Sequence, residues 1–162
     1  MTDACDLTAL QARRMIGDKA LSPVELVDSC IARIEQVDPA LNAMVATCYD
    51  RARDEARTAE KAVMQGDHLG RLHGLPLGVK DLNVTEGVRT TFGSELHVDF
   101  VPAQDERIIA DLRRAGAIVL GKTNTPEFGA GANTTNRVYG PTGNPFDPSR
   151  ICGGSSGGSA VA

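Results

Sequence analysis

Residues 153–159 are Gly-Gly-Ser-Ser-Gly-Gly-Ser, and this run of glycines and serines lies downstream of the sequence Gly78-Val-Lys-Asp81. Glycine allows positive φ angles and a close approach to neighbouring groups. So dense a run predicts a loop that presents its amides and hydroxyls to a ligand. The alternative interpretation is a flexible linker, because Gly/Ser runs are typical of linkers. The rest of the sequence has to distinguish the two.

The composition limits the partners that this chain can have. Its 162 residues fit one domain with a substantial core, and with no Trp, two Tyr and four Phe that core must be aliphatic. The 17 basic and 21 acidic residues give a net charge of -4 without long runs of one sign. This balance argues against binding to nucleic acid or to a membrane by electrostatics. We therefore expect a small molecule or a protein as the partner.

The cysteines lie far apart in the sequence, and neither a secretory signal nor an apolar run of membrane-spanning length accompanies them. We therefore predict a cytoplasmic protein with free thiols. The histidines have no metal-ligand spacing with the cysteines or with one another, so we predict surface histidines and no metal site. The residues concerned are Cys5, Cys30, Cys48, Cys152, His68, His73 and His97.

The first part of the chain, up to about residue 70, has the pattern of helices without chemistry on them. Thr8 and Gln11 have the spacing of a capping box, and Pro23 suits the first position of a second helix. Alanines at helical spacing predict a third helix over residues 48–65. The expected helices start near Thr8, Ser22 and Cys48 and stop near Gly17, Pro39 and Gly66.

The pattern changes after residue 74 to short runs that are typical of strands. Residues 75–79 and 117–120 are expected strands, and residues 105–115 between them are an expected helix. Strands that alternate with helices indicate an α/β sheet. Residues 121–150 have the composition of loops, which is where functional residues usually lie.

The sequence Gly116-Ala-Ile-Val-Leu-Gly-Lys-Thr123 matches the P-loop expression letter for letter. A P-loop needs a phosphate-cradling turn that leads into a helix. Here the spacer residues have the pattern of a buried strand, and Asn124-Thr-Pro126 follows where a helix should start. We therefore predict a buried strand and no nucleotide binding.

Lys80 is a candidate base because it follows an apolar strand. In an extended backbone Lys80 and Asp81 point to opposite faces, so Asp81 need not neutralise the ammonium. Burial would then lower the pKa of Lys80 and make a neutral amine available. A strand-end lysine that reaches solvent is the alternative. Together with the Gly-Ser run, however, Lys80 suggests a serine-lysine hydrolytic site.

Several ordered motifs together resemble the N-terminal part of the amidase signature family. The resemblance implies an α/β fold with a mixed β-sheet core covered by helices. It also implies that residues 1–162 are one part of a single domain, helical over 1–70 and α/β with the catalytic motifs over 71–162. The motifs are Gly74-Leu-Pro-Leu-Gly-Val-Lys-Asp81, Gly87-Val-Arg-Thr-Thr91, residues 116–124, Gly140-Pro-Thr-Gly-Asn-Pro145 and the Gly-Ser run of residues 153–159.

The resemblance also implies a Ser-cisSer-Lys triad that uses no cofactor and no metal. Lys80 would be the base, and Ser155 would be the bridging serine, joined to Gly154 by a cis peptide bond. Gly129 would line the acyl pocket of the substrate site. In the family the nucleophilic serine lies in a third glycine-rich motif further downstream, so we expect these 162 residues to be a fragment without the nucleophile and inactive alone.

The expected function is hydrolysis of a small carboxamide. A tRNA-dependent amidotransferase has a glutaminase subunit with the same motifs, and this subunit is the nearest alternative. That subunit usually has Met-Asp-Glu-Phe where this chain has Thr125-Pro-Glu-Phe128, which favours a general amidase. An inactive fragment or interaction domain is a third hypothesis. As protein partner we expect either a second copy of the chain or the C-terminal part of the enzyme.

Overall fold

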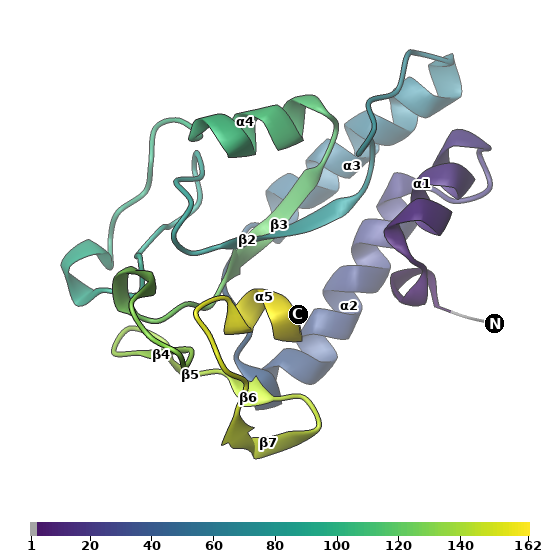
Figure 1. The fold of residues 1–162 in the computed structure, drawn as a ribbon. Coiled ribbons are helices and arrows are strands. Elements are labelled where there is room, and N and C mark those ends of the chain that lie inside the picture. Colours follow the sequence, from purple (N-terminus) through teal and green to yellow (C-terminus); the bar gives the residue numbers. More distant parts are fainter. Residues whose placement is uncertain (1–2) are drawn as a thin grey trace. The chain divides into compact units, whose positions relative to one another are not determined.

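The computed structural model describes residues 3–162 and shows a mixed α/β protein (Figure 1). The helical elements are η1 (Ala4–Asp6), α1 (Ala9–Gly17), α2 (Pro23–Leu41), α3 (Tyr49–Gln65), η2 (Glu95–His97), α4 (Arg107–Arg114), η3 (Glu127–Gly129) and α5 (Gly157–Val161). The strands are β1 (Met44–Thr47), β2 (Pro76–Lys80), β3 (Ile118–Thr123), β4 (Thr135–Asn136), β5 (Gly140–Pro141), β6 (Gly143–Asn144) and β7 (Asp147–Ile151).

The chain folds into two compact units. The first comprises the segment that ends at Arg33 together with Cys48–Leu77 and Ala110–Leu120. The second comprises Ile34–Thr47, Gly78–Ile109 and Gly121–Ala162. The elements α2, α4, β2 and β3 each contribute residues to both units.

The first unit has an aliphatic core. Residues of α1, α2 and α3 form one buried cluster with Leu75, and no residue of this cluster is aromatic. The capping box of α1 is present, because the Thr8 and Gln11 side chains bond to each other's backbone amides. The αL residue Gly66 ends α3 as predicted. The buried cluster is Ala12, Ile16, Leu21, Leu26, Val63 and Leu75.

The central sheet has three strands in the order β1-β3-β2, and β2 and β3 lie side by side in Figure 1. Strand β1 runs antiparallel to β3, with Met44 opposite Thr123. On the other side, the amide of Ile118 donates to Leu75 O and that of Asp81 donates to Thr123 O. These two bonds advance in the same direction along both strands, so the β2-β3 pair is parallel and the sheet is mixed.

Two predictions about the first part of the chain were wrong. The strand β1 interrupts the segment expected to be helical, because its four residues gain their hydrogen bonds from β3 and are too few to show a period. Helix α2 also continues through Pro39 to Leu41. Pro39 lies in the last turn of α2, and the helix ends where Asn42 takes a left-handed φ of 55°.

Residues 121–150, expected to be loop, contain two short hairpins. Strands β4 and β5 pair in one of them, and β6 and β7 pair in the other. The interior of the second unit is also polar, since it buries seven threonines fully or nearly fully, together with Asn124. The threonines are Thr85, Thr90, Thr91, Thr123, Thr125, Thr134 and Thr142. Buried hydroxyls need partners, and in this unit they organise the candidate site.

Candidate active site

Lys80 ends β2, and its ammonium contacts the Gly-Ser run of the second unit. Lys80 Nζ lies 2.8 Å from Ser155 Oγ and 2.9 Å from Ser156 Oγ and donates to both. The hydrogen bond that a serine-lysine site requires between Lys80 and Ser155 is therefore present. The peptide bond between Gly154 and Ser155 is cis, as the resemblance implied. The contact with Ser156 was not foreseen.

The Gly-Ser run is fixed in place by backbone contacts, so the linker interpretation was wrong. Thr134 N donates to Gly153 O, and Gly157 N donates to Thr134 Oγ1, both at 2.9 Å. Gly158 N donates to Asn124 O at 3.2 Å. Both Gly157 and Gly158 are buried. These bonds hold the serine hydroxyls on the side of the loop that Lys80 reaches.

The absence of a side chain at Gly158 is what allows this close packing. A Cβ atom there would lie 2.2 Å from Asn124 N and 2.9 Å from Ala43 O. These are backbone atoms, so no flexible side chain could move away to make room. The glycine at this position therefore has a packing reason that the sequence could not show.

The surroundings of Lys80 favour its neutral amine, the form that can accept a proton. Partial burial lowers the pKa of Lys80 below its usual value, because desolvation penalises the charged ammonium. Its two hydrogen-bond partners here are neutral hydroxyls. The neighbouring Asp81 carboxylate instead accepts hydrogen bonds from Thr91, at 2.5 Å from its hydroxyl and 3.1 Å from its amide. The expectation that Asp81 faces away from the base is thus met.

The segment with the P-loop pattern forms β3, a strand buried along its whole length. A bend and a short 3-10 turn follow it, so the phosphate-cradling turn and its helix are not formed by these residues. The predicted buried strand is confirmed. The absence of nucleotide binding stays a prediction.

Comparison with known proteins identifies the family of this chain. The sequence profile described as Amidase matches residues 25–162. This chain belongs to the amidase family. The A subunit of Glutamyl-tRNA(Gln) amidotransferase from Anaeromyxobacter dehalogenans (strain 2CP-C) is 42% identical over 160 residues, which cover 99% of this chain and 32% of the relative.

Solved structures of the amidase family have the same fold. A bacterial aryl acylamidase of the amidase signature family matches with a TM-score of 0.90 and 36% identity, covering 96% of this chain and 32% of that one. The A subunit of the Glutamyl-tRNA(Gln) amidotransferase of Thermotoga maritima matches with a TM-score of 0.78 and 28% identity, covering 100% and 32%. The chain thus spans about a third of the length of the relatives it matches.

The remaining candidate residues of this amidase-family chain have different surroundings. Gly129 has a φ of 72°, and a Cβ there would lie 2.6 Å from Leu82 Cδ1, so Gly129 packs close to the residue two positions after Lys80. Its role in an acyl pocket stays a prediction. Ser159 is paired elsewhere, because its Oγ lies 2.5 Å from Thr123 Oγ1.

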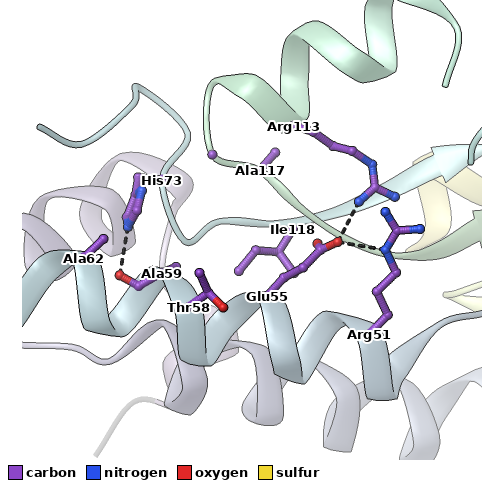
Figure 2. A pocket seen from close by; sticks show the side chains of 10 residues that line it. Arg51, Glu55, Thr58, Ala59, Ala62, His73, Arg113, Ala117 and Ile118 are labelled. Atoms are coloured by element: carbon purple, nitrogen blue, oxygen red, sulfur yellow. Dashed lines mark hydrogen bonds and ion pairs between the residues drawn. The ribbon is translucent and has the colours of Figure 1, made fainter. Parts of the chain in front are cut away.

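A cavity of about 400 Å³ lies in the first unit, and none of the predicted site residues lines it (Figure 2). Its charged groups are already compensated: Glu55 Oε1 accepts hydrogen bonds from Arg51 and Arg113, both at 2.8 Å. His73 Nε2 lies 3.0 Å from Ala59 O in the same view. We place the site at Lys80, where an amine with a lowered pKa meets two hydroxyls, and not at this cavity.

One group of potential metal ligands lies close together among residues 3–162. Asp3, Cys5 and Asp6 form it in the first unit, with both carboxylates exposed. Arg33 forms ion pairs with Asp3 and Asp6 at 3.6 and 3.3 Å, so a guanidinium already provides the countercharge. No helix within residues 3–162 has both the length and the apolar character needed to cross a bilayer.

Sequence reasoning missed two fully buried residues, Asn124 and Lys122. The Asn124 side chain donates to Gly140 O and Thr142 Oγ1 and accepts from Asn136 Nδ2, at 2.7–3.1 Å. Both residues lie in or directly after the segment whose pattern matches a phosphate loop. The sequence feature that could have indicated them is a lysine and an asparagine, Lys122 and Asn124, shortly after the expected strand of residues 117–120.

Proposed function

We propose that this chain supplies the general base and the bridging serine of an amide hydrolase that acts on a small carboxamide. The observation that carries the proposal is the 2.8 Å hydrogen bond from Lys80 Nζ to Ser155 Oγ. Membership of the amidase family and the fold shared with a bacterial aryl acylamidase support it.

In this mechanism neutral Lys80 takes the proton of Ser155, and Ser155 takes the proton of the nucleophilic serine. That serine attacks the amide carbonyl, the nitrogen of the substrate receives a proton and leaves, and an acyl-enzyme results. Water then hydrolyses the acyl-enzyme and regenerates the serine. Backbone amides would stabilise the oxyanion. The resemblance places the nucleophile in a motif outside residues 1–162, so the reaction belongs to the longer protein, in which Gly129 would line the acyl pocket.

The second candidate function is the glutaminase subunit of a tRNA-dependent amidotransferase. The name of the 42% identical relative favours it. Two observations favour a general amidase: the sequence Thr125-Pro-Glu-Phe128, and the closer structural match to the aryl acylamidase than to the Thermotoga maritima protein. We therefore rank the general amidase first.

The test is an assay of the full-length protein with acetamide, benzamide, an anilide and glutamine, alone and with amidotransferase partner subunits. Turnover of simple amides, lost in Lys80→Ala and Ser155→Ala, supports the amidase. Lys61→Ala, which removes an exposed lysine of α3, is the matched control and should keep full activity. Turnover of glutamine alone, dependent on the partners, would favour the glutaminase. No turnover of any amide would refute both functions.

A further inference from the structure

Lys122 is a fully buried lysine in the second unit. Its side chain has no solvent exposure, which is rare for lysine unless the ammonium is paired. The ammonium donates to Thr85 Oγ1 at 2.8 Å, to Thr90 Oγ1 at 3.2 Å, and to the carbonyl of Asn83. All three acceptors belong to the segment of residues 83–90, which lies shortly after Lys80 in the chain.

Asp81 provides a negative charge to the same network. Its carboxylate is fully buried, and burial raises its pKa, while the Thr91 hydroxyl and then the charge of Lys122 act in the opposite direction. Asp81 and Lys122 are thus two opposite charges in this interior. The Glu106 carboxylate also accepts hydrogen bonds from the side chain of Asn83 and the amide of Val84. Holding a cation in such surroundings requires the acceptors to stay where they are, because a buried ammonium without partners is very costly.

Two hydrogen bonds connect Lys122 to the backbone of Lys80. The ammonium of Lys122 binds Asn83 O, and the amide of Asn83 donates to Lys80 O at 3.0 Å. Asp81 N in turn donates to Thr123 O at 2.9 Å, next to Lys122 on β3. The turn that follows Lys80 is thus held at both ends by residues of β3.

We propose that Lys122 is a positioning residue of the candidate active site: its buried ammonium holds the turn after Lys80, and so keeps Lys80 directed at Ser155. The proposal rests on the proposed function only in calling Lys80 the base. A merely structural Lys122 would stabilise the fold without affecting how Lys80 titrates. A positioning Lys122 affects both.

The test measures the titration of Lys80 directly. The full-length protein is acetylated with trace isotopically labelled acetic anhydride between about pH 6 and 11.5, and peptide mass spectrometry gives the labelling of each lysine. Only neutral amines react, so the midpoint of each curve reports the pKa of that lysine. Lys122 should stay unlabelled in the folded chain.

The decisive comparison uses two matched double variants. Thr85→Val with Thr90→Val removes two acceptors of the Lys122 ammonium and keeps the side-chain shape, whereas Thr85→Ser with Thr90→Ser keeps both hydroxyls. In the valine variant the turn loosens, Lys80 reaches solvent, and its midpoint should rise by at least about half a pH unit, a threefold loss of neutral amine. In the serine variant the midpoint should not move.

Two further variants distinguish a specific effect on Lys80 from a general loss of stability. Ile16→Val weakens the core of the first unit without touching this network, and an equal shift of the Lys80 midpoint there would overturn the proposal. Asp81→Asn with Lys122→Met removes both charges together, which folds more readily than removing Lys122 alone. If this variant is folded by circular dichroism and keeps the wild-type Lys80 midpoint, the proposal is wrong.

This outcome is independent of the proposed function. The labelling reports the titration of Lys80 and involves no turnover. If the full-length enzyme keeps its activity in Lys80→Ala, the proposed function is refuted, but the labelling result on the role of Lys122 still holds. If the Lys80 midpoint is unchanged in the valine variant, the positioning role of Lys122 is refuted, but the result of the amidase assay still holds.

Discussion

The substitution Gly158→Ala tests how tightly the Gly-Ser run must pack to hold its serines at Lys80. The added Cβ would lie 2.2 Å from Asn124 N, whereas ordinary van der Waals contact begins at 3.4 Å, so the backbone has to move by about 1.2 Å. Asn124 cannot yield easily, because its amide donates to Ala43 O at 2.9 Å and its side chain is bonded on both sides. We therefore expect the start of α5 and the serines before it to move.

A shift of that size breaks the 2.8 Å bond from Lys80 Nζ to Ser155 Oγ. Misplacing a catalytic group by about 1 Å costs on the order of 10² in rate, and overpacking a buried position costs about 1–3 kcal/mol of stability. Amide turnover and urea unfolding of the full-length protein measure the two effects. Ala160→Ser, on the exposed side of the same helix, should change neither. A Gly158→Ala protein with wild-type turnover and stability would refute this account of the site.

Four further results are expected. Burial raises the pKa of the Cys30 thiol to about 11, with a further rise from Cys5 and an opposing effect of Arg33. At pH 8 iodoacetamide should therefore modify Cys30 about 100-fold more slowly than a thiol of pKa 9.0. Modification as fast as that of a free thiol would contradict this. Because Lys80 must lose its proton to act, kcat/KM should rise as the pH passes through its lowered pKa. Ser156→Asp puts a carboxylate beside the ammonium and should shift this rise to higher pH, whereas Ser156→Asn should not. Calorimetry with ATP and magnesium should show no binding; micromolar binding that Lys122→Ala abolishes would restore the phosphate-loop hypothesis. Residues 1–162 alone should hydrolyse no amide, since loss of a triad member costs on the order of 10⁴–10⁶ in rate, and turnover that disappears in Ser159→Ala would show that the nucleophile was misassigned.

The sequence predicted those elements whose ends depend on local chemistry. Ser22 caps α2 because its hydroxyl accepts from the amide of Val24 two residues later, and Gly66 ends α3 because glycine tolerates the left-handed conformation. The strand β1 could not be predicted in this way. Its hydrogen bonds come from β3, more than seventy residues away, and nothing within its four residues distinguishes it from a loop.

In the candidate site, too, residues in local motifs could be predicted and residues whose role depends on distant contacts could not. Lys80 and the Gly-Ser run lie in short motifs with unusual composition, so a serine-lysine site could be predicted from residue types, and the family resemblance then singled out Ser155. Lys122 could not be recognised, because its surroundings are contributed by residues 83–90 and by Asp81, and a buried lysine looks the same in a sequence as an exposed one. Its segment even matches a phosphate loop letter for letter, although the structure has a buried strand there.

The contrast between the two lysines explains why only one of them suits proton transfer. Lys122 is fully buried, its ammonium donates to the hydroxyls of Thr85 and Thr90, and it acts electrostatically on the buried Asp81 carboxylate, so its positive charge is compensated. Lys80 is only partly buried, and it donates to two neutral hydroxyls, so desolvation lowers its pKa without a carboxylate to restore it. Asp81 follows Lys80 in the chain, yet its carboxylate accepts hydrogen bonds from Thr91 and interacts electrostatically with Lys122. Because Thr91 holds that carboxylate, and Lys80 donates to serine hydroxyls instead, Lys80 remains able to give up its proton.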